Sequence, residues 1–332
     1  MNKIPLSVLE LATVVEGGNL RSAIERTVEV AKHAESLGYK RIWMAEHHNI
    51  EYIASSATAV LIGHVASKTS SLRVGSGGIM LPNHSPLVIA EQFGTLETIY
   101  PGRIDLGLGR APGTDQLTAM ALRRKNMSST YDFPNDVKQL QTYFSKGNSS
   151  SKVRAFPGEG LDIPLWILGS STDSAYLAAE MGLPYAFAAH FAPAQFRIAI
   201  DIYRNNFKCS KQLKKPYVMA CVNVIAAETD SEAEFLATSL IMLFLGLVTN
   251  SRKSIQPPGE LPETYRISAV RSAVNSMMGC TFTGGKDTLR NKLSKFISET
   301  EIDELMVSSN IYDKDAKLKS FSILHDAIDQ LE

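Results

Sequence analysis

Short apolar, β-branched runs alternate with amphipathic stretches along the whole chain. The run at Ile4–Leu11 is followed by Asn19–Leu37, where apolar side chains recur at helical spacing and Gly38 stands where a helix would stop. Eight such runs predict strands: Ile4–Leu11, Arg41–Glu46, Leu72–Leu81, Arg103–Leu108, Ile163–Leu168, Pro184–Ala189, Pro216–Ala226 and Glu304–Ser308. Because a helix-like segment follows each run, we expect an α/β protein with a parallel sheet closed into a (β/α)8 TIM barrel.

Two connections are longer than a minimal barrel needs. They are residues 111–135, after the fourth predicted strand, and residues 246–285, after the seventh. Because long structureless connections are uncommon in compact folds, we expect both to be lids or binding loops. The sequence shows no internal repeat or linker, so we predict a single domain over residues 1–332.

The composition favours a small-molecule partner. Lys+Arg and Asp+Glu are equal at 34 each, so no net charge attracts nucleic acid or an anionic membrane. The longest apolar run, around Leu240–Val248, is short of a bilayer span, and we expect a cytoplasmic protein. The three cysteines have no CxxC spacing, which argues against a disulfide framework and a structural zinc site.

Polar and glycine-rich residues follow five of the predicted strands. In a (β/α)8 barrel the active site lies at the carboxyl ends of the strands, so these segments are the candidates for chemistry. They read AEHHN at 45–49, GSGGIMLPNH at 75–84, GLGRAPGT at 107–114, GSSTDS at 169–174 and AAHF at 188–191.

The GSSTDS and GLGRAPGT segments predict a phosphate pocket. The hydroxyls of Ser170, Ser171 and Ser174 surround the start of a predicted helix, where backbone N–H groups are free to bind an anion, although simple N-capping explains serines there too. Arg110 follows a neighbouring strand, and its guanidinium can clamp a phosphate, although a surface arginine is the plainer alternative. Neither glycine cluster has the spacing of a dinucleotide fingerprint.

The histidines supply groups that titrate near neutral pH. His47 and His48 are adjacent, so on an extended strand they point to opposite faces and do not share a metal. We therefore predict no metal site, with one of the two facing the pocket as an acid, a base or a hydrogen-bond partner. His190 and Glu10 also stand at predicted strand ends and are candidates to line the same mouth.

The glycine-broken run at 73–82, RVGSGGIMLP, permits a turn, a strand bulge or the close approach of a flat ligand. Its place at a strand end between the histidine and arginine segments favours the ligand. We therefore expect Gly77 and Gly78 to form a floor under a flat ring system.

RIWMAEHHN at 41–49, the run from Val74 to Thr114, and WILGSSTDSAYLAAEMGLP at 166–184 together resemble the bacterial luciferase-like flavin-dependent monooxygenases, especially the single-chain alkanal-monooxygenase-like branch. The resemblance implies a barrel that holds FMN at its mouth, where reduced flavin traps O₂ as a C4a-hydroperoxide that oxidises the substrate. By position, His47 matches a histidine beside the flavin C4a, and Arg110 matches a phosphate-binding arginine. Ser171 and Ser174 match phosphate-side hydroxyls, Ser170 contributes backbone, and Gly77–Gly78 matches a non-prolyl cis peptide.

The resemblance also implies partners. They are a small organic substrate, with an aldehyde as one candidate, O₂, and a separate reductase that supplies FMNH₂. Gly109 stands where light-emitting members carry a reactive cysteine, which argues against light emission, and a homodimer is expected. Three alternatives stay open: a flavin-binding barrel without turnover, a deazaflavin-dependent reductase on the same fold, and a phospho-sugar aldolase or isomerase. The last is disfavoured because no lysine stands at a recognisable strand end.

Overall fold

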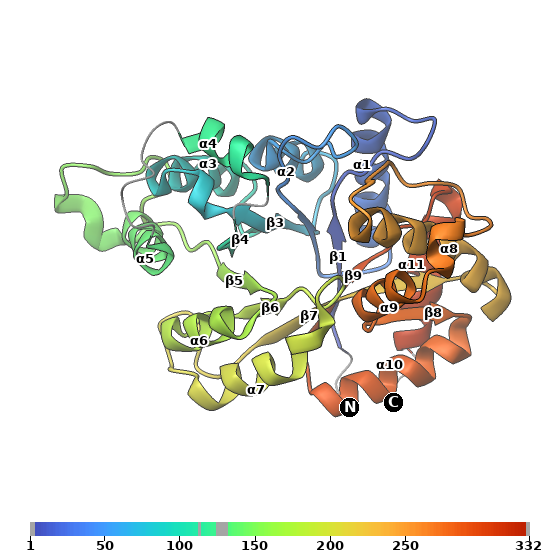
Figure 1. The fold of residues 1–332 in the computed structure, drawn as a ribbon. Coiled ribbons are helices and arrows are strands. Elements are labelled where there is room, and N and C mark those ends of the chain that lie inside the picture. Colours follow the sequence, from blue (N-terminus) through green and yellow to red (C-terminus); the bar gives the residue numbers. More distant parts are fainter. Residues whose placement is uncertain (1–3, 112–113, 124–131, 330–332) are drawn as a thin grey trace.

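The computed structural model describes residues 4–111, 114–123 and 132–329. Parallel strands form a central barrel, and helices cover its outside (Figure 1). The barrel strands are β1 (Leu6–Glu10), β2 (Arg41–Met44), β3 (Arg73–Met80), β4 (Ile104–Gly109), β5 (Leu165–Gly169), β6 (Tyr185–Phe187), β7 (Val218–Ala226) and β9 (Glu304–Ser308). The ring closes because β7 pairs with both β6 and β9, and β9 pairs with β1. The predicted (β/α)8 barrel is confirmed, with every one of the eight strands at its predicted place.

Helices follow the strands around the barrel. They are α1 (Leu20–Ser36), α2 (Thr58–Ala66), α3 (Pro86–Ile99), α4 (Gln116–Arg123), α5 (Phe133–Phe144), α6 (Thr172–Met181), α7 (Phe196–Asn206), α8 (Asp230–Val248), α9 (Ser268–Met277), α10 (Lys286–Thr300) and α11 (Lys314–Asp329). Short 3₁₀ turns are η1 (Leu81–Asn83), η2 (Lys146–Ser150), η3 (Pro193–Gln195) and η4 (Glu263–Arg266).

The two long connections differ from simple loops. Residues 246–285 contain η4, α9 and a ninth strand, β8 (Thr281–Gly284), which pairs in parallel with the last residues of β7. Ile255 exchanges backbone hydrogen bonds with Val14 and Glu16, so this connection lies against the segment that follows β1. Within 111–135 the structure shows α4 and the start of α5, while residues 112–113 and 124–131 lie outside the described part.

Successive side chains of each strand point alternately into the barrel interior and out toward the helix layer. Leu9, Trp43, Trp166 and Met219 pack with one another in a small buried cluster inside the barrel. Val8, one residue before Leu9, instead belongs to the larger cluster between strands and helices. A side chain's register on its strand therefore decides which core it joins.

Charged side chains close the amino-terminal end of the barrel. Arg41 is buried between two carboxylates, 2.6 Å from Asp105 and 2.8 Å from Glu304. Arg73 also binds Asp105, at 2.6 Å, and Tyr217 donates its hydroxyl to Glu304 at 2.7 Å. Burial lowers the pKa of Arg41, but the two carboxylates outweigh this and raise the pKa above its usual value. The network is a structural plug at the end of the barrel opposite the strand ends that carry the candidate site.

Helix α8 is long and apolar enough, by length and composition, to cross a membrane. One side of it is buried in a second core cluster with α9 and the end of β7, which includes Leu240, Phe244, Val274 and Ile225. A core helix passes the same test, so this helix is weak evidence for a membrane span.

Candidate functional site

The predicted site residues lie at the carboxyl ends of five consecutive strands. Gly77 and Gly78 lie in the second half of β3. The other candidates come directly after β2, β4, β5 and β6, and these five strands are neighbours in the sheet; the candidates are His47, Arg110, the serine segment and His190. The loops also touch: Thr114, after β4, donates its hydroxyl to the carbonyl of His48, after β2, at 3.2 Å. Glu10, at the end of β1, is the exception and is described below.

The peptide between Gly77 and Gly78 is cis, as the resemblance implied. The register between β3 and β4 shifts between Ser76 and Ile79, so the strand carries an irregularity there. A Cβ at Gly77 would lie 2.7 Å from Leu9, and one at Gly78 would lie 2.7 Å from the carbonyl oxygen of Gly107. The backbone contact therefore already requires glycine at position 78, whereas a side chain at position 77 would need the Leu9 side chain to shift. Contact of their other side with a flat ring stays a prediction.

The start of α6 is an open helix N-terminus. Its N-cap residue, Ser171, makes no side-chain capping bond, so the simple capping interpretation of this serine does not hold. The N–H of Thr172 donates to the Oε1 atom of Gln195 at a long 3.3 Å. First-turn donors of a ten-residue helix are thus available to an anion.

Arg110 lies beside this helix start and is 52% exposed. Its guanidinium contacts the carboxylate of Asp173, in the first turn of α6, at 3.1 Å. The structure therefore brings together the two halves of the predicted phosphate pocket. It also adds a carboxylate that sequence reasoning did not assign.

The serines of this segment have different surroundings. Ser174 is buried, and its hydroxyl donates to the carbonyl of Ser171 at 2.7 Å and pairs with the Tyr185 hydroxyl at 2.9 Å. These partners give Ser174 a role in holding the shape of the β5–α6 turn. Ser170 and Ser171 are half-buried and lie between the strand and the helix start, where the prediction places phosphate contacts.

His47 and His190 lie close enough to interact electrostatically, although they follow different strands. Burial lowers the pKa of His190 to about 4, a backbone hydrogen bond with Cys221 opposes this, and the charge of His47 lowers it further. His190 is therefore neutral at physiological pH. Its Nδ1 atom is buried without a protein partner among the described residues, which suits a contact with a bound molecule.

Glu46, between the strand β2 and His47, was not singled out by sequence reasoning. Its Oε1 atom accepts from His48 Nε2 at 2.7 Å and from His84 Nε2 at 2.8 Å, and its Oε2 atom accepts from the N–H of Met80 at 3.1 Å. Burial alone would raise the pKa of Glu46, but the hydrogen bonds from His84, His48 and Met80 hold it below its usual value. The charged carboxylate ties the end of β2 to the end of β3.

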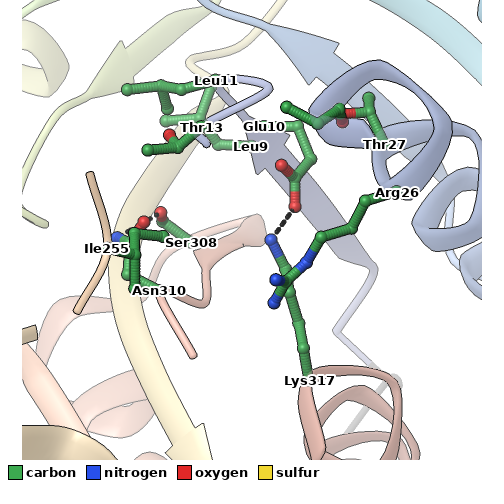
Figure 2. Close-up of a pocket in the computed structure, with 11 residues that line it drawn as sticks. Leu9, Glu10, Leu11, Thr13, Arg26, Thr27, Ile255, Ser308, Asn310 and Lys317 are labelled. Carbon is green, nitrogen blue, oxygen red and sulfur yellow. Dashed lines mark hydrogen bonds and ion pairs between the residues drawn. The ribbon is translucent and has the colours of Figure 1, made fainter. Parts of the chain in front are cut away.

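Glu10 points away from the barrel axis and into the helix layer (Figure 2). Its carboxylate forms an ion pair with the buried amine of Lys317, from α11, and Arg26, from α1, lies beside the pair. Burial lowers the pKa of Lys317 despite the attraction of Glu10. The group borders a cavity of about 10 Å³, which is room for one water molecule. The prediction that Glu10 faces the mouth is corrected here: two residues after Val8, Glu10 shares its outward register.

The chain matches the family model described as luciferase-like monooxygenase over residues 6–296. It is 53% identical to the uncharacterized protein YvbT of Bacillus subtilis (strain 168), covering 97% of this chain and 96% of the relative. It is 48% identical to a luciferase-like monooxygenase of Escherichia coli (strain K12), covering 99% and 98%. An N-acetyl-S-alkylcysteine monooxygenase of Bacillus subtilis (strain 168) is 30% identical, covering 98% of both.

Solved structures with the same fold include members related in sequence and others that share the fold alone. Apo-MsnO8 is similar with a TM-score of 0.87 and 34% identity, covering 98% of both chains. Two structures share the fold alone: the oxygenating constituent of 3,6-diketocamphane monooxygenase from Pseudomonas putida in complex with FMN (TM-score 0.73, 16% identity, covering 98% and 97%), and an F420-dependent secondary alcohol dehydrogenase (TM-score 0.70, 14% identity, covering 98% and 99%). The barrel, the strand-end site and these matches together show that the chain belongs to the luciferase-like monooxygenase family.

Proposed function

We propose that the protein is an FMN-dependent monooxygenase that uses reduced flavin and O₂ to oxidise a small organic substrate, with an aldehyde as the first candidate. The observation that carries the proposal is the meeting of Arg110 with the uncapped start of α6 at the mouth of a luciferase-like barrel. A cation beside free helix N–H groups suits the phosphate of FMN.

The residues present fit such a cofactor. Arg110, Ser171 and the first N–H groups of α6 would hold the phosphate, and the Gly77–Gly78 segment would lie against the ring. When bound, reduced flavin supplies the electrons that activate O₂. His47 would hold or move a proton at its imidazole nitrogens, and the neutral His190 would accept a hydrogen bond at Nδ1 from a bound molecule.

The partners follow from the same proposal. A separate reductase would supply FMNH₂, because the glycine clusters lack a nicotinamide fingerprint. The contacting helices α2 and α3 leave Val60, Val88 and Ile99 exposed, and we propose that a second copy of the chain covers them. A cytoplasmic location stays a prediction.

Replacing Arg110 with alanine tests the phosphate site. Wild-type protein should bind FMN more tightly than riboflavin, and Arg110→Ala should remove most of that difference while leaving riboflavin affinity unchanged. A charge-assisted hydrogen bond contributes about 1.5–3 kcal/mol, which corresponds to about 10–150-fold in FMN affinity. Fluorescence titration with FMN, riboflavin and a deazaflavin measures the effect.

Arg197→Ala is the matched control, because Arg197 is also exposed and also paired, to Glu299 at 2.6 Å, but on α7. It should leave the affinity for every flavin unchanged. Equal binding of FMN and riboflavin by the wild type would refute the phosphate site, and a preference for the deazaflavin would favour the reductase alternative.

Asp173→Asn should act in the opposite direction and tighten FMN binding. The Asp173 carboxylate pairs with the Arg110 guanidinium that would bind the phosphate, and its negative charge would repel the phosphate. Unit charges about 4 Å apart in water interact by about 1 kcal/mol, so we expect about fivefold tighter FMN binding, and less in high salt. Titration of FMN and riboflavin at two salt concentrations measures it. Asp287→Asn, a first-turn aspartate of α10 paired with Arg290, is the control, and a gain for riboflavin as well would contradict the explanation.

A further inference from the structure

Glu46, His48 and His84 place three potential metal ligands together at the carboxyl end of β2. The Glu46 Oε1 atom lies 2.7 Å from His48 Nε2 and 2.8 Å from His84 Nε2. All three ligand atoms lie within 4.8 Å of one another, a grouping found at this one place among the residues that the structure describes. The geometry points to a binding site for a divalent transition-metal ion, with Zn²⁺ as the first candidate.

The ligand set suits that ion. Two imidazoles and one carboxylate are ligands that zinc takes in proteins, at about 2.0–2.2 Å. A tetrahedral arrangement at those lengths separates the ligand atoms by about 3.4 Å, so the present hydrogen-bonded contacts of 2.7 and 2.8 Å need to open by about 0.6–0.7 Å. On binding, each imidazole must present an unprotonated Nε2 atom to the ion, so the proton that Nε2 now donates to Glu46 leaves that atom and the bound ring carries its proton on Nδ1.

The sequence argument against a metal concerned a different pair. His47 and His48 are adjacent, and adjacent residues of an extended segment point to opposite sides. Glu46 and His48 are two residues apart, which lets both side chains face His84, from the segment after η1. The E-x-H spacing therefore places two potential ligands on the same side of the chain, whereas the adjacent histidines of the H-H pair point to opposite sides.

The surroundings prepare the ligands. The Glu46 side chain is 1% exposed, and the N–H of Met80 holds its second oxygen at 3.1 Å, so the carboxylate cannot easily turn away. The side chains of His48 and His84 are 14% and 25% exposed, which leaves a path for an ion and room for water as a fourth ligand. A bound ion would clamp the end of β2 to the segment after β3.

The test is titration of the purified full chain, flavin-free, with Zn²⁺ by calorimetry and with Co²⁺ by visible absorption. A Cys209→Ser background removes the exposed thiol. We expect one saturable site and the absorption bands of a four-coordinate Co²⁺ ion. His84→Gln, which keeps a hydrogen-bond donor, should weaken Zn²⁺ binding by about 10–100-fold or more, since loss of outer-shell partners alone has that effect.

His64→Gln is the control, because His64 is an exposed histidine on α2 away from the cluster, and it should bind as the parent does. His48→Gln provides a second ligand variant if circular dichroism shows that His84→Gln is unfolded. The site is overturned if the parent shows no saturable binding, or if the folded His84 or His48 variant binds as tightly as the parent. None of these measurements depends on flavin binding or turnover.

Discussion

Replacing Glu304 with alanine should lower the free energy of unfolding by about 3–5 kcal/mol, the cost of breaking a buried ion pair by removing one partner. Glu304 is fully buried and accepts hydrogen bonds from Arg41, Lys40, Tyr217 and Ser7. Its loss leaves the buried Arg41 guanidinium with Asp105 as its remaining carboxylate and leaves the Tyr217 hydroxyl without its acceptor.

Urea unfolding followed by circular dichroism measures this difference. Glu299→Ala is the control, because Glu299 also pairs with an arginine but is 41% exposed, and surface pairs contribute at most about 1 kcal/mol. Similar losses for the two variants would show that the plug at the amino-terminal end of the barrel is not a coupled network.

Replacing His47 with alanine should lower the rate of substrate-coupled oxygen consumption by about 10²–10⁴-fold, the usual contribution of a positioned acid or base. His47 is half-buried at the end of β2 and lies close enough to His190 to affect its pKa. FMN affinity should change little, because the proposed phosphate contacts come from Arg110, after β4, and from the start of α6. The assay mixes the protein with FMNH₂ and a panel of aldehydes and thioethers and follows oxygen uptake and product.

His64→Ala provides the control for the loss of an imidazole elsewhere. Full turnover by a His47→Ala protein that binds FMN normally would refute the assigned role. If the wild type binds FMN but couples oxygen uptake to no substrate in the panel, the alternative of a flavin-binding barrel without turnover gains support.

The fold could be read from the sequence because its signal is repetitive. Each strand of the barrel is an apolar run bounded by a turn and followed by an amphipathic segment, so all eight were found. The ninth strand, β8, was missed because Thr281–Gly284 is short and half-exposed, and it joins only the end of β7. Pairing with an existing strand, rather than its own composition, makes it a strand.

The site, too, could be predicted from the sequence only in part. The position of His47, Arg110 and the serine segment at strand ends follows from the order of elements, and neighbouring parallel strands bring such ends together. The pairing of Arg110 with Asp173, and the packing of Ser174 against Tyr185, depend on which way each side chain turns after the strand ends. Glu46 carries no sequence signal beyond its neighbours, because its partner His84 is 38 residues away.

The sequence by itself determined the barrel and the segments that meet at the carboxyl ends of its strands, where the candidate site lies, because hydrophobic period and element order are local properties of the chain. Tertiary structure alone decided that Glu10 faces Lys317 in the helix layer, that the Gly107 backbone leaves room only for glycine at position 78, and that Arg41, Asp105 and Glu304 meet in the barrel. These outcomes depend on strand register and on contacts between residues far apart in the chain, where a shift of one residue reverses the direction of a side chain.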